Sequence, residues 1–144
     1  MSQATSLFAP FKLGPLQLDN RIVMAPMTRN KSPGNIPGAE VVEYYRRRAA
    51  GGVGLIITEG TCIDHIAASG YPDVPYFHGE ERLAGWAQVA AAVHAEGGRI
   101  APQLWHCGGM RRAGHRSERF CHPRSGRAWR EASGTTTSHH RAFW

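Results

Sequence analysis

The chain has 144 residues, of which 42% are hydrophobic, and 17 Lys and Arg against 11 Asp and Glu make its formal net charge +6. This length is enough for one domain with its own core. No apolar run approaches the length of a membrane span, and the first residues lack a basic segment followed by an apolar one, so we expect neither a membrane helix nor a signal peptide. Three cysteines form no paired framework, which favours a cytoplasmic protein with reduced thiols.

The charge is concentrated in the last quarter of the chain. Residues 1–110 contain nine basic and nine acidic residues, whereas residues 111–144 contain eight Arg, two Glu and no Ile, Leu, Val or Met. A segment without aliphatic side chains cannot bury enough surface to offset its conformational entropy. We therefore predict a folded part at residues 1–112 and a disordered Arg-, His- and Ser-rich tail at residues 113–144.

The first predicted element is a small hairpin. Phe11–Leu13 and Leu16–Leu18 alternate apolar and polar residues around Gly14 and Pro15, a pattern typical of two short antiparallel strands. We expect this hairpin to close the amino end of a barrel and to carry no chemistry.

Three apolar runs then predict buried strands at residues 21–25, 53–58 and 99–104. Two helical patterns separate them. The first, at residues 39–50, ends before two glycines and is expected to bury Val42, Tyr45 and Ala49. The second, at residues 80–96, is expected to bury Leu83, Trp86, Ala90 and Val93. A long loop is predicted at residues 59–79.

The alternation of strands and helices requires parallel pairing with right-handed crossovers. Polar, Gly and aromatic residues follow each predicted strand, at residues 25–28, 59–61 and 103–105. The carboxyl ends of parallel strands are where an α/β barrel places its active site. We therefore predict that these three stretches form one wall of one pocket.

From about residue 7 to residue 112 the chain resembles the Old Yellow Enzyme family of FMN-dependent NADH:flavin oxidoreductases. Several motifs in the same order carry this resemblance. They include Leu7-Phe-Ala-Pro-Phe-Lys-Leu-Gly14, Asn20-Arg-Ile-Val-Met-Ala-Pro-Met-Thr-Arg29, Gly54-Leu-Ile-Ile-Thr-Glu-Gly-Thr61, Gly70-Tyr-Pro72 and Gln103-Leu-Trp-His106.

The resemblance implies the amino-terminal portion of a TIM (β/α)8 barrel, with the hairpin and about three βα units, and an FMN site at the strand ends. Pro26, Met27 and Thr28 would lie along the flavin ring, with Thr28 near its C4 oxygen and N5. Gly60 would bring its backbone close to the ring. Gln103 would meet the pyrimidine edge, which needs both a donor and an acceptor.

The resemblance also implies a reaction. NAD(P)H would reduce FMN, which would pass hydride to an activated alkene such as an α,β-unsaturated carbonyl. Trp105 and Tyr71 would line the substrate side. The family's proton donor and its pair of residues that grip the substrate carbonyl have no counterpart in this sequence, so no catalytic residue is predicted.

The family pattern is lost after Arg112, and two explanations of the tail stay open. Its abrupt Arg-, Ala-, Gly- and His-rich composition is what a frame-shifted reading of a GC-rich gene produces. Alternatively, its arginines with Phe120, Trp129, Phe143 and Trp144 form a basic arm for nucleic acid. No metal is predicted, because Cys107, His115, Cys121 and His122 lack the spacing of a zinc site.

Two functional readings follow for the whole chain: an ene-reductase, or a truncated fragment of one that is inactive. The expected partner is a small enone-type molecule, not a membrane or nucleic acid, and a homo-oligomer stays open. Arg29 and Glu59 are interpreted as a structural charge pair. The run Arg46-Arg47-Arg48 is interpreted as a solvated helix face, and Cys62 and Cys107 as small core residues.

Overall fold

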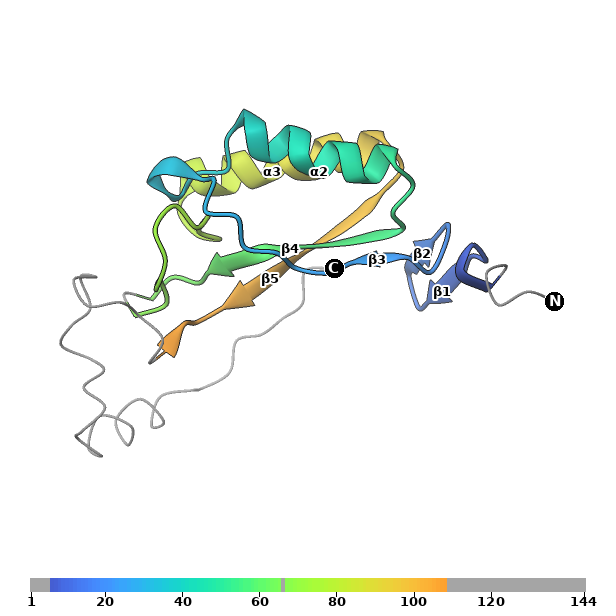
Figure 1. Cartoon of the computed structure of the whole chain (residues 1–144), viewed down its shortest axis with the longest axis horizontal. Helices are drawn as coiled ribbons and strands as arrows, with labels where there is room; N and C mark the ends of the chain where they lie inside the picture. Colours follow the sequence, from blue (N-terminus) through green and yellow to red (C-terminus); the bar gives the residue numbers. More distant parts are fainter. Residues whose placement is uncertain (1–5, 66, 109–144) are drawn as a thin grey trace.

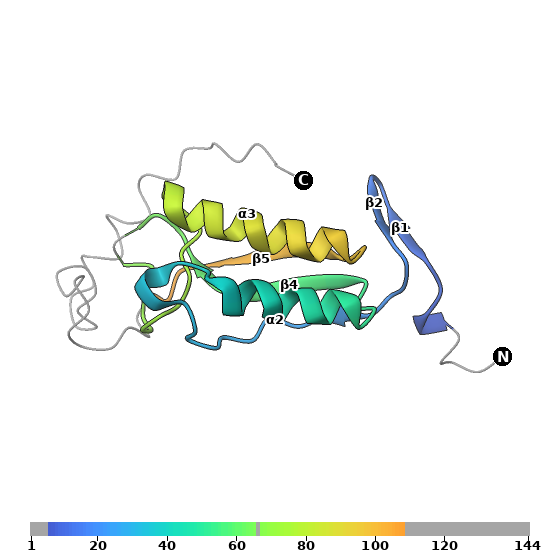
Figure 2. The ribbon, with the colours of Figure 1, turned by 90° about the horizontal axis from the view of Figure 1, so that it is seen from above.

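A computed structural model describes residues 6–65 and 67–108 of the chain. Its centre is a parallel three-stranded sheet in the order β3-β4-β5, formed by β3 (Val23–Met24), β4 (Leu55–Cys62) and β5 (Arg99–Trp105). Two helices, α2 (Ala39–Ala50) and α3 (Glu80–Ala95), connect the strands and cover the same face of the sheet (Figures 1 and 2). The described part contains two complete βα units and a third strand, and it does not close into a barrel; the segment after β5 lies outside the described residues.

The predicted hairpin is confirmed. β1 (Phe11–Leu13) pairs antiparallel with β2 (Leu16–Leu18), and Gly14 in the turn has φ of +55°. Asn20 then ties the hairpin to the sheet: its side-chain N–H donates to the Gly52 carbonyl at 2.8 Å, and its Oδ1 accepts from Ile22 N–H at 2.9 Å. The hairpin therefore lies at the amino ends of the strands (Figure 1).

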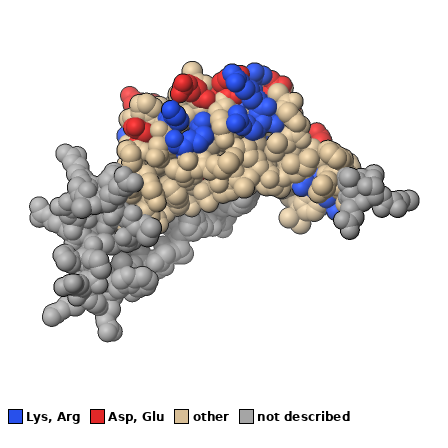
Figure 3. Space-filling view, viewed as in Figure 1, with Lys and Arg blue, Asp and Glu red and all other residues tan. Residues whose placement is uncertain are grey.

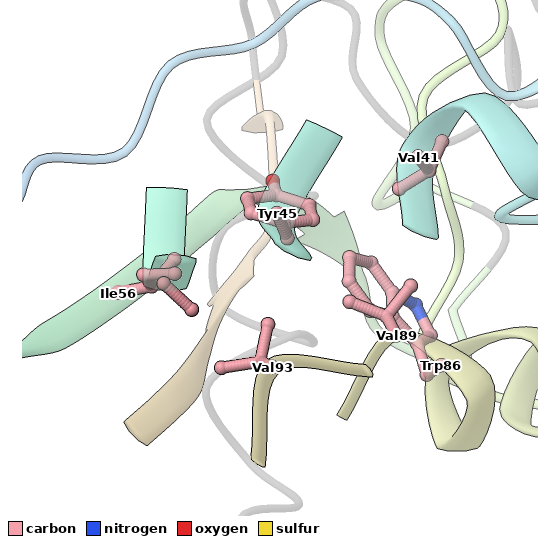
Figure 4. Packing of buried hydrophobic residues seen from close by; sticks show 7 residues of the cluster. Val41, Tyr45, Ile56, Trp86, Val89 and Val93 are labelled. Carbon is pink, nitrogen blue, oxygen red and sulfur yellow. The ribbon is translucent and has the colours of Figure 1, made fainter. Parts of the chain in front are cut away.

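The main core lies between the two helices and the sheet (Figure 4). Its buried members are Val41, Tyr45, Ala49, Ile56, Trp86, Val89 and Val93. Helix α2 therefore presents Val41 in the same stripe as Tyr45 and Ala49, because residues four apart share one helix face, and Val42, predicted to be buried, packs against this core while only partly buried. Ala90 is only half-buried in α3.

The prediction that Leu83 is buried is wrong. Its exposed fraction is 43%. Gly85 is the residue of this turn that meets the preceding segment, since a Cβ there would lie 2.6 Å from the Pro37 carbonyl oxygen. Leu83 instead lines a cavity of about 300 Å³ beside β5, together with Trp86, Ile100 and Pro102.

Strand β4 runs four residues beyond its predicted end at Thr58. A bulge follows Ile57, and pairing with β5 resumes at Gly60. Ile57 pairs with Ala101, but Gly60 pairs with Gln103, so β4 has one extra residue opposite Pro102. Proline has no N–H for the ladder. The next residue of β5 is paired through a side chain, because the Thr58 Oγ1 accepts the Gln103 N–H at 3.1 Å. Residues 59–62, assigned to a loop from the sequence, are strand.

Strand β3 is shorter than predicted: only Val23 and Met24 pair with β4, at Leu55 and Ile56. Farther along β4, a loop segment takes the place next to it. Tyr76 forms a parallel bridge with Cys62, and Phe77 N–H donates to the Cys62 carbonyl at 2.9 Å. The short 3-10 helix η1 (Pro33–Asn35) is held against the same segment by Asn35, whose side chain donates to Val74.

The arginine run in α2 is a solvated, ion-paired surface, as interpreted from the sequence. Arg46 contacts Glu43 at 2.7 Å and Glu96 at 2.6 Å, and Arg47 contacts Glu43 at 2.7 Å. Hydrogen bonds from Arg46 and Arg47 lower the pKa of Glu43 to about 2. Side chains of both charges lie together on this helical side of the molecule (Figure 3). Neither α2 nor α3, nor any other helix in the described ranges, is long and apolar enough to cross a bilayer.

Candidate functional site

The carboxyl ends of β4 and β5 lie next to one another, and the segment that follows β3 contacts β4 at Glu59. Gly60 of β4 pairs with Gln103 of β5, and the Thr61 hydroxyl donates to the Gln103 carbonyl at 3.0 Å. On the other side, Arg29 N–H donates to the Glu59 carboxylate at 3.2 Å. Since Thr28 precedes Arg29 and Gly60 follows Glu59, the segment after β3 is held beside the end of β4.

The predicted cofactor-binding groups remain available at this end of the sheet. Pro26, Met27 and Thr28 are exposed in the segment that follows β3, and 51% of Met27 is accessible. Gln103 is half-buried. Within residues 6–65 and 67–108 neither the Thr28 hydroxyl nor the Gln103 side-chain amide has a hydrogen-bond partner. These two polar groups are therefore free to bind a ligand, and binding of a flavin there stays a prediction.

The Trp105 ring covers Gly60. A Cβ at residue 60 would lie 2.6 Å from Cε2 of the indole, which no side chain tolerates. The ring is held on both sides: Nε1 donates to the Cys62 sulfur at 3.1 Å, and Tyr71 stacks on it at 5.8 Å between centroids. The contact that requires glycine here is thus with Trp105; approach of the Gly60 backbone to a flavin is a separate, untested expectation. Tyr71 and Trp105, predicted to share one wall, do lie together.

The pairing of Arg29 with Glu59 is confirmed, and it involves a third residue that sequence reasoning assigned only to the core. The Glu59 side chain is fully buried, and Arg29 donates to it through Nε at 3.2 Å and Nη2 at 2.7 Å. The Tyr45 hydroxyl accepts the Glu59 backbone N–H at 2.8 Å and lies 3.5 Å from its carboxylate. The sequence indicated the ion pair, because Arg29 and Glu59 follow two neighbouring predicted strands, but it gave no sign of the contact with Tyr45.

The buried phenol of Tyr45 should make the stability of the fold depend on pH. Burial raises its pKa above the usual value, an effect that the hydrogen bond from Glu59 opposes. Unfolded tyrosine ionises near pH 10. The folded state keeps its proton to higher pH, so this contribution to stability is complete below about pH 10 and is lost as the pH rises further. We expect the urea midpoint of the wild type to decrease as the pH is raised from about 9.5 to about 11, a range around the ordinary tyrosine pKa of about 10. The midpoint of Tyr45→Phe should decrease less over the same range. An equal decrease in the two proteins would contradict this.

Cys62 is a buried core residue, as interpreted from the sequence. Burial raises the pKa of its thiol above the usual value. Cys107 is half-buried, and its backbone N–H donates to the Ala68 carbonyl at 3.0 Å. In the ranges that the structure describes, no group of three or more His, Cys, Asp or Glu side chains could hold a metal. His115, Cys121, His122 and the predicted tail lie outside those ranges.

Histidines 65 and 106 meet at the rim of this end of the sheet. His106 Nε2 lies 3.3 Å from His65 Nδ1, and both side chains are exposed. His65 Nδ1 also accepts the Ala67 N–H at 3.1 Å. Sequence reasoning placed His106 near the rim without a role and did not anticipate its neighbour, because His65 lies in the loop that follows β4.

Comparison with known proteins agrees with the family resemblance. The NADH:flavin oxidoreductase / NADH oxidase family matches residues 6–135. The family match thus continues beyond Arg112, where the sequence motifs end. The predicted domain boundary at residue 112 lies outside the described residues. Rice 12-oxophytodienoate reductase 7 is 43% identical over 109 residues, which are 76% of this chain and 26% of the rice protein. The NADP-dependent oxidoreductase lnbE of Aspergillus flavus is 43% identical over 72% of this chain and 28% of its own length.

Solved structures of the same family have the same fold over the described part. Morphinone reductase in complex with tetrahydroNAD aligns with a TM-score of 0.69 and 46% identity, over 74% of this chain and 28% of that protein. The Old Yellow Enzyme homologue from Zymomonas mobilis aligns with a TM-score of 0.68 and 37% identity, over 74% and 29%. The chain therefore spans between a quarter and a third of the length of these relatives.

Proposed function

Because this chain belongs to the NADH:flavin oxidoreductase / NADH oxidase family, that of the Old Yellow Enzymes, we propose that its three strand ends form part of the FMN site of an ene-reductase. FMN is the cofactor of this family and NAD(P)H its reductant. When bound, FMN supplies the redox chemistry, taking hydride from NAD(P)H and passing it to the β-carbon of an activated alkene such as an α,β-unsaturated carbonyl. The relatives named as reductases of 12-oxophytodienoate and morphinone support this substrate class.

The proposed roles of this chain's residues follow from their chemistry. Thr28 offers a hydroxyl and a backbone N–H, donors that favour negative charge near the C4 oxygen and N5 of the ring. Gln103 presents a donor and an acceptor in one side chain, which suits the pyrimidine edge. Pro26 and Met27 lie in the same exposed segment as Thr28 and supply apolar contact along the ring. Tyr71 and Trp105, stacked on each other, form the substrate wall.

One observation carries the proposal: Arg29, the residue after Thr28, donates to Glu59, and Gln103, 75 positions from Thr28 in the printed sequence, pairs with the adjacent Gly60. The side-chain polar groups of Thr28 and Gln103 are unpaired within the described residues. Thr28 is exposed and Gln103 is half-buried, so both groups are accessible to a ligand, and one with a complementary edge could bind both at once.

A second candidate is an inactive fragment of such an enzyme, favoured by what the sheet leaves open. Within residues 6–65 and 67–108, β3 and β5 pair with no strand except β4. Ile56 and Ile100 pack toward the helices, so Ile57 and Ala101 face the opposite side, which no described helix covers. We propose a cytoplasmic protein whose partner is a small molecule, and we propose that the 144-residue chain by itself binds FMN weakly and lacks ene-reductase activity.

The first experiment is an absorption spectrum of the purified chain. We expect it to be colourless after dialysis and not to oxidise NADPH in the presence of FMN and 2-cyclohexenone, because an open sheet face leaves a flavin exposed to water. A flavin spectrum that survives dialysis, or turnover of the enone, would contradict the inactive-fragment proposal and support the ene-reductase directly.

The site itself is tested by titrating FMN with the chain and following flavin fluorescence. We expect weak but saturable quenching. Gln103→Leu removes about two hydrogen bonds worth about 1 kcal/mol each, so its Kd should rise about 10- to 30-fold. Gln17→Leu, at an exposed position of β2, is the matched control and should leave the Kd unchanged. Equal affinities of the two variants would remove Gln103 from the site.

A further inference from the structure

The Glu59 carboxylate is the most completely enclosed charge in the described part of the chain. Its side chain has no exposed area, and that of Arg29 is 16% exposed. Both carboxylate oxygens accept hydrogen bonds from this one arginine: Oε2 from the backbone N–H, and Oε1 from Nε and Nη2. Arg29 thus binds the Glu59 carboxylate through both its backbone N–H and its side chain. These contacts hold the backbone at residue 29 as well as the guanidinium in place.

Both partners are themselves held in place. The Arg29 guanidinium lies 3.7 Å from the centroid of the Tyr44 ring, whereas Glu59 is bound at its backbone N–H by the Tyr45 hydroxyl. Tyr44 and Tyr45 are successive residues of α2. The helix therefore braces the ion pair from both sides, so movement of the segment after β3 requires breaking contacts to α2 as well as to β4.

The pair lies between the two strand ends of the candidate site. Thr28 is the residue before Arg29, and Gly60, which pairs with Gln103, is the residue after Glu59. From β4, the hydroxyl of Thr58 accepts the N–H of Gln103 on β5 across the bulge. The two bulge residues thus bind neighbours on opposite sides of β4. Glu59 binds the segment that carries Thr28, whereas Thr58 binds Gln103.

We propose that Arg29 and Glu59 are positioning residues, which hold Thr28 at a set distance from Gly60 and Gln103 so that a flavin ring can contact all three. This inference rests on the proposed function. The alternative is that the pair contributes only to stability. Replacing a buried ion pair by apolar side chains of similar size often leaves stability unchanged or higher, so stability and positioning can be separated experimentally.

The decisive variant is the double substitution Arg29→Met with Glu59→Leu. We expect its urea midpoint to equal or exceed that of the wild type, while amide hydrogen exchange at residues 28–30 becomes faster by about tenfold or more, since Arg29 N–H loses its acceptor. Its Kd for FMN, from quenching of flavin fluorescence, should rise about tenfold or more. Arg29→Lys keeps the charge but not the two guanidinium donors, and should give intermediate values.

Glu43→Gln is the matched control. Glu43 also binds two guanidinium groups, but on the exposed surface of α2, so exchange at residues 28–30 and the Kd for FMN should not change. Unchanged exchange at residues 28–30 in the double variant would overturn the positioning role, whether or not flavin binds. Faster exchange with an unaltered Kd for FMN would overturn it too. If the wild type fails to quench FMN at all, the proposed function fails, and the exchange measurement still decides whether the pair holds the segment.

Discussion

Replacing Tyr45 with alanine should lower the free energy of unfolding by about 3–5 kcal/mol, as expected for truncating a large, fully buried aromatic side chain. Tyr45 has no exposed area and contacts both sides of the core: its ring lies 6.2 Å from that of Trp86, and its hydroxyl binds Glu59. The substitution therefore leaves a cavity between α2 and α3 and, in addition, an unpaired N–H on β4. Urea unfolding followed by tryptophan fluorescence measures the effect.

Tyr45→Phe separates the two contributions. It keeps the ring but leaves the buried Glu59 N–H without an acceptor, so a loss of about 1–3 kcal/mol is expected. Tyr44→Phe is the control, because the Tyr44 hydroxyl has no hydrogen bond within the described residues; its effect should stay below about 0.5 kcal/mol. If Tyr45→Phe costs no more than Tyr44→Phe, the hydroxyl does not hold β4 in place.

Gly60→Ala is the second substitution with a large expected effect, about 1–3 kcal/mol, because the new methyl group overlaps the indole of Trp105. The ring cannot simply move aside, since Cys62 holds its N–H and Tyr71 stacks on its face. Movement of the ring would change the wall predicted for the substrate. The free energy of unfolding reports the first consequence, and a shift of the tryptophan emission maximum relative to the wild type reports the second.

A double-mutant cycle identifies the cause of that loss. In a Trp105→Ala background the space above Gly60 is empty, so Gly60→Ala should then cost far less, and the coupling should be at least about 1 kcal/mol. An equal cost in both backgrounds would place the strain in the β4 backbone and not in the contact with Trp105.

Much of this fold was predictable from local patterns. The hairpin, the two helices and the parallel order of three strands follow from turn residues, two periodicities and the glycines that end α2 and α3. The boundaries of α2 agree with the prediction because Gly51 stops a regular apolar stripe. The end of β4 differs from the prediction, because the residues directly after Thr58 are polar or glycine, which is typical of a loop when only the sequence is considered.

The grouping of the predicted residues near the strand ends follows from the fold, whereas their contacts do not, and binding of a cofactor there stays a prediction. Alignment of the carboxyl ends of parallel strands brings residues 28, 60 and 103 near one another without any knowledge of side chains. That Trp105 lies on Gly60, and that Tyr45 supports Glu59, depends on the bulge opposite Pro102. A shift of one residue in a strand turns the following side chains to the opposite face, and no sequence pattern here marked that shift.

The sequence by itself determined the family, the order of elements and which residues stand at the strand ends, because periodicity, glycines and motifs are local properties of the chain. Only the tertiary structure decided that Glu59 is buried against Arg29 and Tyr45, and that the Thr58 hydroxyl accepts the Gln103 N–H beside the bulge. The reason is physical: the free energy of a buried charge or an unpaired N–H depends on which distant group reaches it, and that group is set by the register of neighbouring strands.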